Sequence, residues 1–158
     1  DLYTWSGPYM TSTQSVVVRA DSSINSLSDL DGACVAVQAT TKPEEILLGA
    51  FDPRLPEVGK VYTLSQMDDV YACLRKGYAD AIAGHTYALR AFMETAPGAY
   101  RMLDEELFVS QLGVAFERGT HTDLADSLTE VLSALRREGF TQSIVEKYGI
   151  SDPEKEAE

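Results

Sequence analysis

The sequence predicts a three-layer α/β fold, in which helices cover both faces of a mainly parallel sheet. Strand-like and helix-like segments alternate from residue 33 to residue 103, the order that strand–helix–strand units with right-handed crossovers produce. Two of the strands, 34–37 and 80–84, are apolar runs without alternation, which is typical of strands buried on both faces. The helix that precedes the second of these strands has a clear stop signal, Gly77. These observations indicate one α/β domain.

Composition excludes several classes of protein. The chain has 158 residues with 44% apolar and 24% charged side chains, which is enough apolar content for a buried core. The formal net charge of -12 argues against nucleic acid as a partner. No apolar stretch approaches the roughly 18 residues of a membrane span, and the N-terminus lacks the features of a signal peptide.

The first elements are a strand, a short helix and a second strand. A β-branched run predicts a strand at 15–19, after the turn-forming segment 5–9. Ser26 is a suitable N-cap for one helical turn before the turn pair at 31–32, and the buried strand 34–37 follows.

The middle of the chain continues the alternation. Pro43 suits the first position of a helix, with two glutamates placed favourably for the helix dipole. After a short strand at 60–63, Ser65 and Asp68 resemble the capping box of a helix that Gly77 ends.

The C-terminal part predicts a helix at 86–94, an edge strand at 100–103 and a further strand at 112–116. Thr122 is expected to cap a helix with an apolar stripe, and a last helix starts at Thr141 and ends at Gly149. The stripe consists of Leu124, Leu128, Val131, Leu132 and Leu135. Both helices are amphipathic and need a surface to cover.

Six motifs in order give a family resemblance: WSGPY, SLSDLDG, VAVQATT, LRKGYADAIAG, QLGVAFERG and IVEKYG. Together they resemble bacterial extracellular solute-binding proteins of family 3, which include the polar amino-acid-binding components of ABC importers. The resemblance covers residues 5–149 and implies the periplasmic binding protein type II fold, with a periplasmic or extracellular location.

The resemblance also implies how the chain is divided. Members of the family have two lobes joined by two hinge strands, and here most of the first lobe is missing. Residues 1–19 match a hinge strand segment, 20–110 the α/β domain of the second lobe, and 111–150 the return hinge strand with the C-terminal helices. Residues 151–158 form a tail or linker. An unpartnered leucine stripe on these helices predicts a homodimer, or helices folded back onto the lobe. The alternative is that the rest of the first lobe belongs to a longer protein and that these helices are tolerated without it.

The first candidate binding segment follows the strand at 34–37. In α/β sheets, ligands sit at the carboxyl ends of parallel strands. The resemblance assigns ligand contacts to Thr41 and Lys42 by matched position, with Gln38 and Thr40 beside them. The alternative is a capped turn whose hydroxyls serve only the following helix.

The second candidate is His85, directly after the strand at 80–84. Amino-acid-binding relatives commonly place an aspartate here, which accepts hydrogen bonds from the ligand ammonium. A neutral imidazole offers one acceptor, and a protonated one offers none. The histidine therefore favours a carboxylate ligand without an amine, or an altered site. The alternative role for His85 is to cap the next helix.

The expected function is binding of an amino acid or small carboxylate, without catalysis, cofactor or metal. The domain would serve an importer with its membrane permease, or a receptor with a downstream signalling domain. Two alternatives stay open: an enzyme similar to cyclic-carboxylate dehydratases, in which His85 would act as acid or base, and an interaction module that has lost its ligand. Cys34 and Cys73 are too few for a disulfide scaffold, and their pairing stays open.

Overall fold

A computed structural model describes residues 2–49 and 53–148 of the chain. The chain forms two compact units. One consists of Thr13–Val109, and the other of Asp1–Ser12 with Ser110–Glu158. The tail or linker expected at 151–158 lies outside the described residues.

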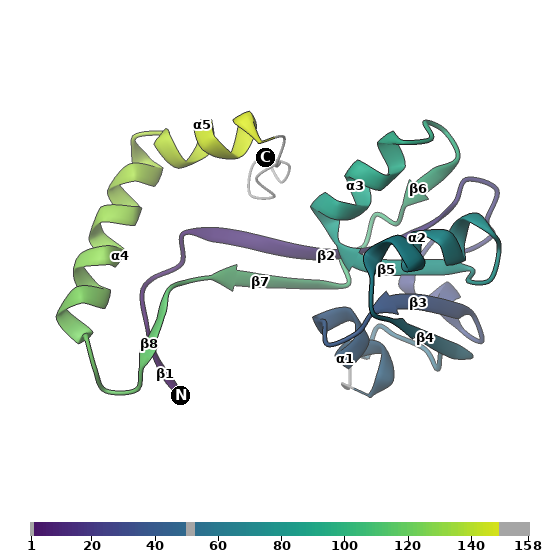
Figure 1. Ribbon diagram of the computed structural model, residues 1–158, viewed down its shortest axis with the longest axis horizontal. Helices are drawn as coiled ribbons and strands as arrows, with labels where there is room; N and C mark the ends of the chain where they lie inside the picture. Colours follow the sequence, from purple (N-terminus) through teal and green to yellow (C-terminus); the bar gives the residue numbers. More distant parts are fainter. Residues whose placement is uncertain (1, 50–52, 149–158) are drawn as a thin grey trace. The chain divides into compact units, whose positions relative to one another are not determined.

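The unit Thr13–Val109 is built on a six-stranded sheet (Figure 1). Its strands are β2 (Met10–Arg19), β3 (Cys34–Gln38), β4 (Lys60–Leu64), β5 (Ala81–His85), β6 (Tyr100–Met102) and β7 (Phe108–Leu112). The order is β4-β3-β5-β2-β6, and β7 also pairs with β2. Strand β3 runs parallel to β4 and β5, whereas β2 runs antiparallel to β5 and β6. The predicted α/β class is confirmed.

Helices cover both faces of this sheet (Figure 1). They are the short 3-10 helix η1 (Leu27–Leu30), α1 (Lys42–Leu48), α2 (Met67–Arg75) and α3 (Thr86–Glu94). Neighbouring strand residues contribute to opposite cores. Residues 17, 36 and 82 pack with α2 and α3, while residues 16, 18, 35 and 37 pack with η1 and α1. The two covered faces explain why these strands are apolar without alternation.

The boundaries of α2 differ in part from the prediction. The chain stays extended through Gln66, which is the N-cap residue, so the expected capping box at Ser65 is wrong. The stop at Gly77 is confirmed. Its φ of 72° is the left-handed conformation that glycine adopts without strain, and the Tyr78 amide donates back to the Cys73 carbonyl at 2.9 Å.

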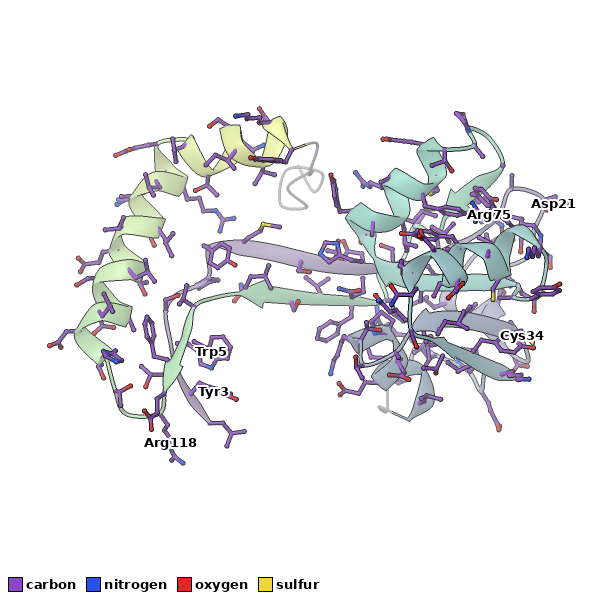
Figure 2. The ribbon with its side chains drawn as sticks, viewed as in Figure 1. Tyr3, Trp5, Asp21, Cys34, Arg75 and Arg118 are labelled. Carbon is purple, nitrogen blue, oxygen red and sulfur yellow. The ribbon has the colours of Figure 1, made fainter. Side chains whose placement is uncertain are left out.

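The second unit contains a two-stranded antiparallel ribbon and two helices. Strand β1 (Tyr3–Trp5) pairs with β8 (Ala115–Glu117), and α4 (Thr122–Arg137) precedes α5 (Phe140–Lys147). The Gly7 amide donates to Thr129 Oγ1 of α4 at 2.7 Å. Figure 2 shows Tyr3 and Trp5 projecting from β1, and their rings meet edge to face.

Two predictions for this unit are wrong. The strand expected at 112–116 is interrupted, because β7 ends at Leu112 and β8 begins at Ala115. Val114 between them exchanges hydrogen bonds of 2.9 Å with Ser6, which turns the chain there. The N-cap of α4 is His121, in a left-handed conformation, and the expected cap Thr122 is the first helical residue. Helix α5 starts at Phe140, and its expected end at Gly149 lies outside the described residues.

Both cysteines are free thiols. Cys34 lies at the start of β3, where its amide donates to the Asp80 carboxylate at 2.9 Å (Figure 2). Of the helices in the described ranges, none has the length and apolar character needed to cross a membrane.

Candidate functional site

All five predicted binding residues lie at one edge of the main sheet. Gln38 is the last residue of β3, and His85 is the last residue of the parallel strand β5. Val37 pairs with Ala83, so both strands end at nearly the same level. The segment 38–42 therefore shares the carboxyl edge of the sheet with His85, the edge at which α/β proteins bind ligands.

The segment 38–42 is held by its own hydrogen bonds. Thr41 Oγ1 donates to the Gln38 carbonyl at 2.6 Å, and Gln38 Nε2 donates to the Ser65 carbonyl at 3.2 Å. Thr40 has a φ of 60°, which is costly for a β-branched residue. Its amide donates to Glu44 Oε2 at 2.6 Å, which holds this conformation.

These bonds decide which chemical groups the segment presents. The hydroxyl of Thr40 donates to the Ala39 carbonyl at 2.7 Å, and that of Thr41 is committed to Gln38. Each threonine oxygen therefore offers acceptor lone pairs to a ligand. Lys42 forms an ion pair with Glu45 at 2.7 Å, and its ammonium lies 5.2 Å from the Phe108 ring centroid. One bond leaves an ammonium with further donor capacity.

His85 is the N-cap of α3. Its Nδ1 accepts a hydrogen bond from the Tyr87 amide at 3.3 Å. An accepting Nδ1 means that the neutral ring carries its proton on Nε2. Burial lowers the pKa of His85 from its ordinary value, because desolvation penalises the imidazolium. A neutral ring presents no positive charge at the site, and its capping role is the alternative that the sequence had left open.

A third strand contributes polar groups that the sequence analysis missed. Gln14 of β2 pairs with His85, and the flanking Thr13 and Ser15 reach the hydroxyl of Thr86. The available signal was two hydroxyl residues, two apart, at the start of an apolar strand. It was not recognised because only tertiary structure places β2 beside β5.

A hollow of about 430 Å³ lies at the opposite edge of the sheet, near the starts of β3 and β5. Its lining includes Asp29 and Asp80. The Asp80 carboxylate accepts from the Cys34 amide, and the Asp29 carboxylate accepts from the amides of Asn25 and Ser26. The backbone bonds lower the pKa of Asp29 below its ordinary value. Both carboxylates thus serve the chain's own backbone.

Comparison with proteins of known structure supports this fold. No known family profile matches the chain. Among solved structures, the substrate-binding protein of an amino acid ABC transporter is 27% identical, with a TM-score of 0.68 over 92% of this chain and 62% of its own. An ancestral amino acid-binding protein, a precursor of cyclohexadienyl dehydratase, is 25% identical with a TM-score of 0.72, over 92% of this chain and 61% of its own.

The GluR0 ligand-binding core from Nostoc punctiforme, solved with L-glutamate, is 20% identical, with a TM-score of 0.72 over 92% of this chain and 65% of its own. At this identity the similarity shows the fold alone. The solved structures similar to this chain are thus amino-acid-binding proteins of the periplasmic type II fold, which confirms the predicted resemblance. The chain spans about three fifths of the length of these proteins.

Proposed function

We propose that this chain is a ligand-binding lobe of a solute-binding domain that captures an amino acid or small carboxylate. The observation that carries the proposal is the common position of Gln38, Thr40, Thr41, Lys42 and His85 at the carboxyl edge of β3 and β5. The fold is one in which similar structures bind amino acids. The ligand would be bound by both hydrogen-bond donors and hydrogen-bond acceptors.

The hydrogen bonds of the site support such a ligand. The threonine hydroxyls of segment 38–42 present acceptors, because their protons bond to backbone carbonyls. Lys42 keeps donor capacity beside its bond to Glu45. An amino acid carries an ammonium donor and a carboxylate acceptor, so it matches both kinds of group.

The test is a chemical-shift titration of the ¹⁵N-labelled chain with L-arginine, L-glutamine and L-glutamate. We expect saturable shifts of amides 38–42 and 85–86, with Kd no tighter than millimolar, because about two fifths of the fold of the similar structures has no counterpart here. Thr41→Val should weaken binding, whereas Thr95→Val, the same change at the far end of α3, should not. Shifts absent from the site amides would contradict the proposal.

We propose binding without catalysis. His85 is the residue that an enzyme would use as acid or base, yet its Nδ1 is engaged by the Tyr87 amide as a helix cap. Incubation with a cyclic carboxylate such as prephenate should give no turnover. Turnover that disappears in His85→Ala would establish the dehydratase alternative.

The proposed setting is outside the cytoplasm. The domain would act with a membrane permease or with a downstream signalling domain, as the similar structure from an ABC transporter suggests. The gene sequence on both sides of the chain distinguishes these two partners, because a receptor requires an apolar span after the domain.

We also propose that the C-terminal helices form a homodimer interface. Exposed apolar side chains are concentrated in their unit. On α4, on α5 and at the C-cap of α5 these are Leu124, Val131, Phe140, Ile144 and Tyr148, each between 42% and 63% exposed. They present on the order of 500 Å², about the size of the largest apolar patch on a typical monomer, which is often functional.

The charges of α4 favour antiparallel pairing of two copies. Asp123 lies in the first turn, and Arg136 and Arg137 lie in the last turn, beside Glu138. Two antiparallel helices bring the acidic start of each near the more basic end of the other, which favours this orientation.

Sedimentation velocity between about 5 and 200 µM measures the association, a range that brackets typical weak dimers. We expect a dimer at the upper end that Leu124→Glu with Val131→Glu abolishes, while Leu48→Glu, an exposed leucine of α1, preserves it. A chain that stays monomeric throughout this range contradicts the homodimer. The apolar surface would then pack against the part of the fold that the similar structures have and that has no counterpart in this chain.

A further inference from the structure

Strand β2 contains three buried hydroxyl residues, Ser12, Thr13 and Ser15, and the last two share a partner. Thr13 is 8% exposed and Ser15 is 3% exposed, and the following Val16 is fully buried. Burying a hydroxyl costs free energy unless it forms hydrogen bonds. Both side chains must therefore have partners, and both have the same one.

That shared partner is Thr86, the first residue of α3. Thr13 Oγ1 donates to Thr86 Oγ1 at 2.7 Å, and Ser15 Oγ lies 2.6 Å from the same oxygen. Ser15 pairs with Gly84 in the β2–β5 ladder, so the cluster sits directly at the end of β5. The three hydroxyls join β2 to the start of α3.

The direction of the bond between Ser15 and Thr86 follows from burial. This bond is the one side-chain hydrogen bond of Ser15 within the described ranges. If Ser15 accepted, its own proton would be buried without a partner, at a cost of about 1–3 kcal/mol. Ser15 therefore donates to Thr86, which pairs its buried proton.

Thr86 then accepts two hydrogen bonds through a single oxygen. A hydroxyl oxygen has two lone pairs and one proton, so both lone pairs are used and the proton remains. Thr86 is only partly buried, at the carboxyl edge of β5 beside His85. Neither bond to the two buried hydroxyls uses this proton, so Thr86 can donate it to a further acceptor.

We propose that Thr86 contacts the ligand and that its hydroxyl donates a hydrogen bond to a carboxylate of the solute, with Thr13 and Ser15 as positioning residues. This inference rests on the proposed function of the site. A fixed hydroxyl suits a charged acceptor, because hydrogen bonds to ionised groups are the stronger ones and geometry is set before binding.

The experiment compares ligands that differ by a carboxylate. The labelled chain and Thr86→Val are titrated with L-arginine and agmatine, and with L-glutamine and 4-aminobutanamide, where the second of each pair lacks the α-carboxylate. We expect Thr86→Val to weaken binding of the amino acids about tenfold, the factor that corresponds to about 1.4 kcal/mol. Binding of the decarboxylated analogues should stay unchanged.

Two further variants separate ligand contact from structural support. Thr86→Ser keeps the hydroxyl and should bind amino acids as the original chain does. Ser15→Ala removes one anchor and frees a lone pair of Thr86, so it should weaken binding about two- to threefold. If Thr86→Val does not fold, these two variants test the proposal by themselves, and the control Thr95→Val should leave binding unchanged.

The outcomes distinguish this inference from the function on which it rests. If the original chain gives no shifts at 38–42 or 85–86 with any probe, the proposed function fails and the role of Thr86 fails with it. Suppose instead that the original chain binds, and that Thr86→Val weakens the binding of amino acids and of analogues equally, or changes neither. The binding function then stands, and the proposed contact between Thr86 and the carboxylate is wrong.

Discussion

Replacement of Thr40 by asparagine should stabilise the protein, although Thr40 lies in the candidate site. Its φ of 60° is left-handed backbone, which costs an L-residue roughly 1–2 kcal/mol and a β-branched residue most of all. Asparagine tolerates this conformation far better, because its side chain bonds to the local backbone. The chain accepts this strain at the position where the site segment turns from β3 toward α1.

The magnitude follows from two opposing terms. Relief of part of the strain contributes about 1 kcal/mol. Loss of the exposed bond from Thr40 Oγ1 to the Ala39 carbonyl costs about 0.5 kcal/mol. The net gain is about 0.5 kcal/mol, which for a unit of this size corresponds to a rise in Tm of about 2–4 °C.

Thermal unfolding followed by circular dichroism measures the change. The matched control is Thr95→Asn, where φ is -69° and the hydroxyl donates to the Phe92 carbonyl at 2.7 Å. This control has no strain to relieve, so its Tm should fall. If Thr40→Asn lowers the Tm as much as the control does, the strain at Thr40 is absent and the reasoning is refuted.

Two further predictions concern backbone packing and pH. Gly59→Ala should lower the free energy of unfolding by about 1–3 kcal/mol in chemical denaturation, because a Cβ there would overlap the backbone carbonyl of Gly32. Gly49→Ala, with open space around it, should change the free energy of unfolding by less than about 1 kcal/mol. Equal effects of the two substitutions would contradict this prediction. Because burial lowers the folded pKa of His85, the unfolded chain binds its proton first, so stability should fall as pH drops below about 6.5 toward the lowered value. His85→Asn, which keeps a capping acceptor, should show a smaller loss of Tm between pH 7 and 5, and an equal loss in this variant would contradict the role of His85.

Local patterns were sufficient for most of the elements. The order of strands and helices from β3 to β6 follows from apolar runs, a proline at a helix start and Gly77 at a helix end, all of which act within a few residues. The misplaced N-caps of α2 and α4 are shifts of one residue, but the error at the strand after β7 falls where a distant partner decides. Strand 112–116 is interrupted because Ser6 bonds to Val114, more than a hundred residues away in sequence.

The candidate site shows the same division. Strand ends and the resemblance indicated Gln38, Thr40, Thr41, Lys42 and His85, and the parallel register of β3 and β5 places them at one edge. The geometry of Thr40, its bond to Glu44 and the tautomer of His85 follow only from the folded structure, since each depends on atoms that face one another only after folding.

The sequence by itself determined the α/β class, because burial on both faces of a sheet leaves a continuous apolar run in each strand. It also determined which segments end at the carboxyl edge of the sheet, because parallel strands end together. Only the tertiary structure decided that Thr13 and Ser15 converge on Thr86. Their strand β2 lies beside β5 although about 70 residues separate them in the chain, and no local pattern encodes which strands become neighbours.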